Sequence, residues 1–228
     1  MAWIGGIFNK VNMGQGELRK KLALMMETAS LASEPSSVAY PRYISSILDD
    51  ANGKALVKVS LPVEETSSQH VYTDYQEKLV LIYDGHLYDF EGMEAELPQA
   101  QHRGNRTTAE SLVHLLAELP GEMEQNVREA LTNLDGDYAL AISNTDRIVI
   151  SRNSLGTKPL YFAENNTFSA FASNKKSLWK IALGEVGPLR AGMLATFDSR
   201  GVRVEESSPF AKGETYIISM AQAVAEYE

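Results

Sequence analysis

The stretch Leu134–Phe162 reads LDGDYALAISNTDRIVISRNSLGTKPLYF. Larger and smaller apolar residues alternate over 138–142, and the alternation resumes at 148–150 after a polar turn, which is typical of a β-hairpin. The polar, glycine-containing segment 153–157 interrupts the second strand. Because the residue before a proline is pushed out of the helical region, Lys158-Pro159 indicates a return to extended chain. The stretch therefore predicts strand, turn, strand, bend and strand.

The composition fits a single globular domain over residues 1–228. The chain has 228 residues and 44% of them are apolar, which is enough to bury a substantial core. The longest apolar runs, such as Leu79–Tyr83, have the length of a strand and are too short to span a membrane. The N-terminus has no basic segment leading into an apolar one, so it does not resemble a signal peptide. We expect a cytoplasmic protein that binds no membrane.

The charge and the cysteine count exclude several functional classes. A formal net charge of −9 disfavours binding to nucleic-acid backbones, which requires clustered lysine and arginine. The chain has no cysteine, which excludes a disulfide framework, a thiolate zinc site and a thiol nucleophile. It also lacks the Gly-Lys-Ser/Thr motif of phosphate-binding loops. We expect neither a metal nor a cofactor.

Further strands and helices surround the central stretch. Residues 3–8 are apolar and include a glycine pair, which suits a buried strand. Asn52-Gly53 separates two strand-like runs, and Asn-Gly is the strongest short hairpin signal. Asp84-Gly85 indicates a turn after the buried strand 79–83. Helical periodicity is found over the ranges 16–31, 107–119 and 122–131. Short strands and hairpins divided by helices fit an antiparallel α+β sandwich.

The central stretch also resembles the amidotransferase domain of asparagine synthetase, a class II glutamine amidotransferase. That family writes LDGMFAFAI and ARDRLGIKPLYY where this chain has residues 134–142 and 151–162. The family's N-terminal strand, MCGIAGIF, is similar to residues 1–8. The resemblance covers most of residues 2–197. It implies the four-layer αββα sandwich of N-terminal-nucleophile hydrolases, with mostly antiparallel sheets and here without the family's synthetase domain.

The resemblance also indicates that the catalytic groups are replaced. The family's nucleophile is a cysteine exposed by removal of the first residue, and Ala2 stands at that position. A methyl group cannot attack an amide. The family's oxyanion hole combines an asparagine side chain with the N–H of the next glycine. Here Asp84 replaces the asparagine and Gly85 is retained, so a hydrogen-bond acceptor takes the place of a donor, whose loss costs about 3 kcal/mol of transition-state stabilisation.

Two substrate-binding groups of the family are replaced as well. Its Arg-Gly-Pro-Asp motif, whose arginine grips the substrate carboxylate, keeps only the proline in this chain. Arg42 lies a few residues further on and is a candidate for the same role, with an exposed surface position as the alternative. The family's Ser-Asp-Thr-Glu tetrad opens a helix, and its aspartate holds the substrate amine. Thr107 and Thr108 stand in that tetrad, so the helix cap is kept and the carboxylate is lost.

Two larger side chains complete the set of candidate cleft residues. Trp3 stands where the family has a small glycine, and we expect its indole to fill part of the former glutamine cleft. His86 lies beside the predicted Asp84-Gly85 turn. It is a candidate base, with a solvated surface histidine as the alternative.

Three functions remain open from the sequence. The first is a non-catalytic, amidotransferase-like protein that acts as a binding or regulatory subunit, with a separate synthetase or amidotransferase chain or as a homo-oligomer. The second is an enzyme that reuses the cleft without an N-terminal nucleophile, with Asp84, His86 and Arg42 as its candidates. The third is a part in glutamine-dependent amide transfer beside a separate synthetase chain. Because four functional groups are replaced together, the sequence favours the first.

Overall fold

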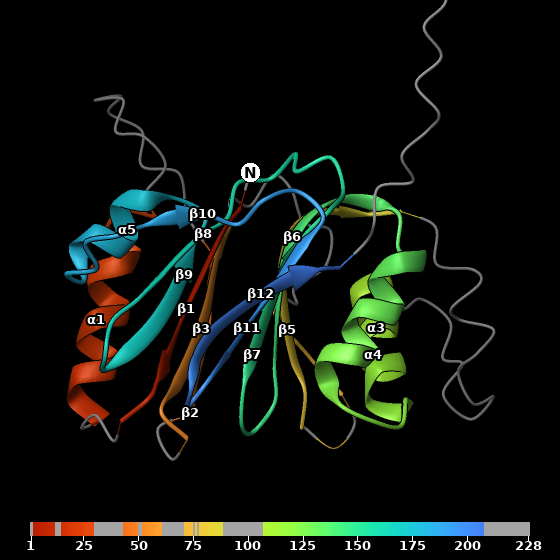
Figure 1. Cartoon of the computed structure of the whole chain (residues 1–228), viewed down its shortest axis with the longest axis horizontal. Helices are drawn as coiled ribbons and strands as arrows, with labels where there is room; N and C mark the ends of the chain where they lie inside the picture. Colours follow the sequence, from red (N-terminus) through yellow and green to blue (C-terminus); the bar gives the residue numbers. More distant parts are fainter. Residues whose placement is uncertain are drawn as a thin grey trace, which may run out of the picture.

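Two six-stranded sheets pack face to face in the computed structural model of the protein, and helices cover both outer sides (Figure 1). The structure describes residues 2–11, 15–29, 43–49, 52–60, 71–74, 76, 78–88 and 107–207. Every strand pairing is antiparallel among these residues. The four-layer αββα sandwich implied by the resemblance is confirmed.

The first sheet, sheet A, has the strand order β10-β8-β9-β1-β3-β2. β1 lies inside this sheet, between β9 and β3, which agrees with the buried strand expected at residues 3–8. Asn52-Gly53 joins β2 to β3 as predicted, and Gly53 has the positive φ of +64° that such a turn requires. The strands of sheet A are β1 (Trp3–Asn9), β2 (Tyr43–Asp49), β3 (Lys54–Ser60), β8 (Tyr161–Glu164), β9 (Phe168–Ala172) and β10 (Gly187–Pro188).

The second sheet, sheet B, has the order β12-β11-β7-β6-β5-β4. The predicted hairpin of the central stretch forms β6 and β7 in the middle of this sheet. β5 lies next to the edge of this sheet, because only the two-residue strand β4 lies beyond it. The strands of sheet B are β4 (Tyr72–Thr73), β5 (Val80–Leu87), β6 (Gly136–Ser143), β7 (Ile148–Arg152), β11 (Met193–Asp198) and β12 (Gly201–Glu206).

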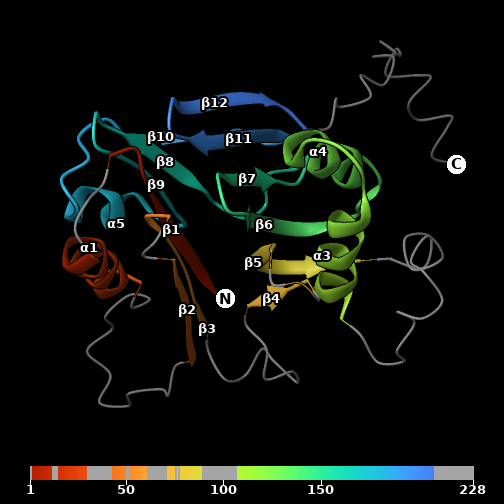
Figure 2. The ribbon, with the colours of Figure 1, turned by 90° about the horizontal axis from the view of Figure 1, so that it is seen from below.

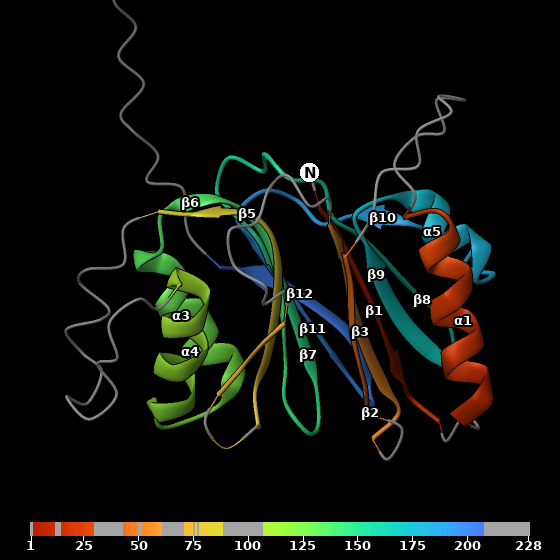
Figure 3. The same ribbon diagram turned by 180° about the vertical axis from the view of Figure 1, so that it is seen from behind.

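Helices form the two outer layers, with α1 and α5 on sheet A and α3 and α4 on sheet B (Figures 2 and 3). Thr107 caps α3 as predicted, since its hydroxyl accepts the N–H of Glu110 at 3.3 Å. Among the described residues, no helix combines the length and the hydrophobicity that a membrane span requires. The helices are α1 (Gln15–Glu27), α3 (Thr108–Glu118), α4 (Met123–Asn133) and α5 (Lys175–Lys180).

One apolar cluster lies between each pair of neighbouring layers. Leu112 of α3 and Leu140 of β6 belong to the cluster between sheet B and its helices. Ile82 of β5 and Ile150 of β7 belong to the cluster between the two sheets. Leu140 and Ile150 are both fully buried, and they lie on opposite faces of sheet B. The third cluster packs α1 and α5 onto sheet A.

The segment 153–160 carries the chain from β7 of sheet B to β8 of sheet A, and we call it the crossover. Asn153 Nδ2 donates to the carbonyl of Gly136 at 3.0 Å, and Asn153 Oδ1 accepts the N–H of Thr157 at 3.2 Å. Arg152 Nη1 donates to the carbonyl of Leu189 at 2.6 Å. Gly156 has a φ of +63°, a left-handed conformation that glycine adopts without strain. These contacts fix the bend that the sequence predicts.

Our expectation of a turn at Asp84-Gly85 is wrong. β5 continues through both residues to Leu87, and Gly85 lies opposite Tyr138 of β6. Gly85 has a φ of +122°, and a Cβ atom there would lie 1.7 Å from the backbone oxygen of Asp137. The glycine therefore permits a close approach of two paired strands. In the sequence, a glycine with this role has the same local pattern as a glycine in a turn.

Gly156 provides a test of the crossover. Gly156→Val should lower the free energy of unfolding by about 1–3 kcal/mol, because a β-branched residue is strained at a positive φ. The added Cβ would also lie 2.8 Å from the Cβ of Ala191. Urea denaturation followed by circular dichroism measures the change.

Gly184→Val is the matched control for this variant. Gly184 has no atom within 4 Å of an added Cβ, so this change should stay within about 0.5 kcal/mol. Equal stability of Gly156→Val and the unmodified chain would contradict the argument for the crossover.

Candidate functional site

Asp84 of β5 lies beside the start of β1, so the two catalytic positions implied by the resemblance come together. Asp84 Oδ1 accepts the backbone N–H of Ala2 at 3.1 Å, which links sheet B to sheet A. Lys158 Nζ, from the crossover, lies 3.9 Å from Asp84 Oδ1 and 4.0 Å from Asp137 Oδ2. Thr157 Oγ1 donates a hydrogen bond to Asp137 Oδ1. We call these five residues the Asp84 cluster.

The Asp84 carboxylate is almost completely buried. Asp84 is 5% exposed and Ala2 is 8% exposed. Burial raises the pKa of the Asp84 carboxyl above its ordinary value, and Lys158, the Ala2 N–H and Lys58 oppose this shift only in part. The ion pair with Lys158 offsets this desolvation only in part, because its N–O distance is 3.9 Å and the Lys158 side chain is 20% exposed.

The cluster presents a hydrogen-bond acceptor where an oxyanion hole needs donors. Asp84 Oδ1 already accepts the N–H of the Ala2 backbone. A developing oxyanion beside this carboxylate would be repelled, and Ala2 has no side-chain atom that can attack an amide carbon. Within the described residues, no three His, Asp or Glu side chains gather closely enough to hold a metal ion.

The prediction that the Trp3 indole fills part of the former glutamine cleft is wrong. Its indole packs into the cluster between sheet A and the helices α1 and α5, and it lies over Gly5 of the same strand. Alternate residues of a strand point to opposite faces, and Ile4 of β1 faces the other sheet, toward Ile82 of β5. Trp3 therefore lies on the face of β1 that points away from the sheet carrying Asp84.

The remaining candidates lie outside the Asp84 cluster. His86 is exposed, and its ring stacks on Tyr88 with the centroids 6.5 Å apart, in agreement with a surface histidine. Thr107 caps α3, and among the described residues no hydrogen bond joins Thr107 or Thr108 to Ala2 or Asp84. Arg42 lies outside the described residues.

Sequence reasoning missed Lys158, Asp137 and Thr157 as members of this site. Thr157 and Lys158 stand in the segment LGTKPLY, which supported the resemblance without suggesting a role for either side chain. Asp137 of β6 lies opposite His86 of β5 in the ladder between these strands. His86 is three residues beyond Tyr83 along β5. The signal for these residues is the crossover itself, because it brings a lysine to the end of the sheet where Asp84 lies.

Comparison with known proteins identifies the family of the domain. The sequence pattern of a family described as "Glutamine amidotransferase domain" matches residues 57–180, which is more than half of the chain. A protein of Methanocaldococcus jannaschii named "Putative asparagine synthetase" is 30% identical over 109 residues. These residues are 47% of this chain and 18% of that protein. The chain thus spans a small part of the curated relative that it matches.

Solved structures agree with this assignment at the level of the fold. Glutamine phosphoribosylpyrophosphate amidotransferase from B. subtilis superposes with a TM-score of 0.61 at 15% identity, over 91% of this chain and 49% of that chain. A glutamine aminotransferase class-II domain protein from Silicibacter pomeroyi gives a TM-score of 0.52 at 13% identity, over 92% and 100% of the two chains. Together with the match over residues 57–180, this likeness leads to one conclusion: the chain belongs to the glutamine amidotransferase domain family, with the class II fold.

Proposed function

We propose that this amidotransferase domain neither binds nor hydrolyses glutamine at the start of β1, and that it acts as a binding or regulatory subunit. The observation that carries the proposal is the hydrogen bond from the Ala2 N–H to the buried Asp84 carboxylate. In a working site of this family the position of Ala2 supplies the nucleophile, and the position of Asp84 supplies an amide donor. Here the two positions bond to each other, and neither has the required chemistry.

The charges around this contact support the same conclusion. Transition-state stabilisation requires donors that point at the developing oxyanion, and each donor contributes about 3 kcal/mol. The Lys158 ammonium lies within 4.0 Å of both Asp84 and Asp137 and interacts with both carboxylates. Its charge therefore contributes to the contacts between the crossover and sheet B.

A regulatory role fits a domain whose framework is retained. The paired sheets and the cap of α3 are formed in the structure. Ala2 and Asp84 stand where the resemblance implies a nucleophile and an amide donor, which supports the proposal. Such a domain can still present its surface to another protein. We propose a separate synthetase or amidotransferase chain as the partner, which affinity purification of the tagged chain from its own organism would recover.

The purified protein should release neither ammonia nor glutamate from glutamine. The reason is that nucleophilic catalysis needs an attacking lone pair at position 2, and alanine has none. A coupled glutamate assay, with an active amidotransferase as positive control, measures this. Turnover above the buffer blank that persists after repurification would contradict the proposal.

Ala2→Cys should also fail to produce glutaminase activity. The thiol would stand beside a buried carboxylate, so the oxyanion would still lack its amide donor. Ala2→Cys combined with Asp84→Asn is the matched comparison, since it restores both the nucleophile and the donor. Activity in the single variant would show that Asp84 does not prevent catalysis.

Asp84→Asn alone should raise the stability of the protein at neutral pH. The folded-state pKa of Asp84 lies above the ordinary value of 3.8, so folding disfavours the ionised form. The stability that this group contributes is fully present below 3.8 and is lost as the pH rises through the folded-state pKa. The asparagine Oδ1 atom can still accept the Ala2 N–H.

The difference in unfolding free energy between Asp84→Asn and the unmodified chain should therefore be largest at neutral pH and vanish in acid. Asp146→Asn, at an exposed turn position, is the control for loss of a carboxylate elsewhere. Urea titrations over this pH range give both differences. A variant that is less stable than the unmodified chain at neutral pH would show that Asp84 is held by its partners more strongly than burial disfavours it.

A further inference from the structure

Four strands lie at the edges of the two sheets, β10 and β2 in sheet A and β12 and β4 in sheet B (Figure 2). The outer side of an edge strand presents backbone N–H and C=O groups that can pair with another chain. Natural proteins prevent such pairing with short edge strands, with proline or with charged side chains. β2 has seven residues and is the longest of the four. An edge that is long and lacks these protections is a candidate surface for association.

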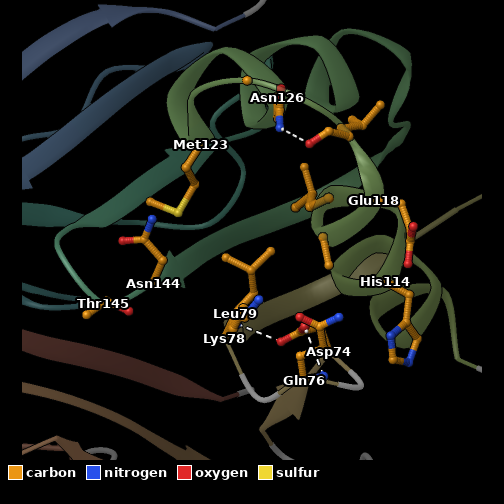
Figure 4. A pocket seen from close by; sticks show the side chains of 14 residues that line it. Asp74, Gln76, Lys78, Leu79, His114, Glu118, Met123, Asn126, Asn144 and Thr145 are labelled. Atoms are coloured by element: carbon orange, nitrogen blue, oxygen red, sulfur yellow. Dashed lines mark hydrogen bonds between the residues drawn. The ribbon is translucent and has the colours of Figure 1, made fainter.

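The edges β10 and β4 are protected by their short length. β10 is Gly187–Pro188, two residues of which one is a proline. β4 is Tyr72–Thr73, and the buried Asp74 follows it in the wall of a hollow of about 570 Å³ (Figure 4). The Asp74 carboxylate accepts the N–H of Gln76 at 3.2 Å and that of Leu79 at 2.7 Å, so the chain turns from β4 toward β5. Each of these two strands offers only two residues to a partner.

The edge strand β12 is protected by charge. Three of its six residues are charged, namely Arg203, Glu205 and Glu206. Arg203 pairs with Glu124 at 3.2 Å, and Glu205 pairs with Arg128, so both side chains contact α4. A partner strand on this edge would lie against charged side chains, which disfavours its binding.

β2 lacks each of these protections. Its sequence is YISSILD, without proline, lysine or arginine. All seven residues pair with β3 in an unbroken register, so no bulge twists the edge away. The only charged residue, Asp49, is engaged within the chain, because its carboxylate accepts a side-chain N–H of Asn52 at 2.9 Å and lies 3.6 Å from Lys54 Nζ. Among the described residues, no strand pairs with the outer side of β2.

One face of β2 carries an uncovered apolar side chain. Ile44 lies opposite Val59 of β3 and Ser46 lies opposite Val57, and both valines belong to the cluster between sheet A and its helices. Leu48 packs against the same cluster. This face therefore points toward the helical layer, but Ile44 is 56% exposed and Ser46 is exposed as well. An exposed isoleucine on an edge strand favours a partner that covers it.

β2 is complementary to a second copy of itself. When two copies pair antiparallel about a two-fold axis at Ser46, all seven residues of each strand lie opposite a residue of the other. Ile44 of each copy then lies opposite Leu48 of the other on the same face, and apolar cross-strand pairs of this kind stabilise a sheet. Asp49 lies opposite Tyr43, so no two like charges meet. A shift by one residue would move the apolar face of the second copy to the other side of the sheet.

We propose that the outer edge of β2 is a self-association surface, at which two copies of the chain pair antiparallel about a two-fold axis at Ser46. The pairing joins the two copies of sheet A into one continuous sheet, with the two-fold symmetry that is most common among homo-oligomers. A contact of one strand with one strand is smaller than a standard protein interface, so the dimer depends on protein concentration. No residue of the Asp84 cluster lies on β2, so the inference is independent of the proposed function.

Sedimentation equilibrium over a range of protein concentrations tests the association. We expect the average mass to rise with concentration from that of one chain toward that of two. Ser46→Lys and Ser46→Glu each place two like charges opposite one another at the axis, and each should raise the dissociation constant by roughly three- to ten-fold. An equimolar mixture of the two variants should recover the association, because unlike charges then meet at the axis.

Val204→Lys is the matched control. Val204 is 44% exposed on the charged edge strand β12, so a lysine there should leave the dissociation constant unchanged. Circular dichroism verifies that each variant is folded. The proposal is overturned if the average mass stays that of one chain at every concentration, if the two Ser46 variants associate as the unmodified chain does, or if their mixture associates no more than either variant alone.

Discussion

The crossover from β7 to β8 is the constraint on which the rest of the structure depends. The two strands belong to different sheets, and the chain must turn from one sheet to the other within the eight residues 153–160. Asn153 bonds to Gly136 at the start of β6 and to Thr157 further along the bend, while Arg152 bonds to Leu189 beside sheet A. These contacts fix the path of the crossover between the two sheets. The positive φ of Gly156 makes the bend possible.

The same constraint creates the Asp84 cluster. Lys158 reaches Asp84 because the crossover passes over the end of sheet B, and Ala2 reaches Asp84 because β1 lies inside sheet A. The family fold thus brings together the positions that would perform amide chemistry. In this chain they form a hydrogen bond between a backbone N–H and a buried carboxylate, and this contact links the two sheets.

Local patterns in the sequence predicted most of the strands and helices. The hairpin of 138–150, the Asn52-Gly53 turn and the cap at Thr107 depend on neighbouring residues alone, and the structure confirms each of them. The order of the strands and the four layers came from the resemblance, because local patterns do not specify which strands pair over long distances.

The errors have a common physical origin in those long-range pairings. Asp84-Gly85 has the local signature of a turn, but pairing with β6 extends β5 through it, and Gly85 provides the close approach. Trp3 was placed in the cleft because its size differs from that of glycine, whereas the register of β1 decides which face it occupies. Lys158 could not be assigned to the site because its distance from Asp84 is 74 positions in sequence but 3.9 Å in space.

The most direct measurement of the central claim is a glutamine titration observed at the Asp84 cluster itself. The backbone amide signals of Ala2 and Gly85 in ¹⁵N-labelled protein report on the surroundings of the Asp84 cluster. The account predicts that neither signal moves with increasing glutamine, because the Asp84 carboxylate already holds the Ala2 N–H. A saturable shift of both signals would contradict it and would show that glutamine, the family's substrate, still binds at the start of β1.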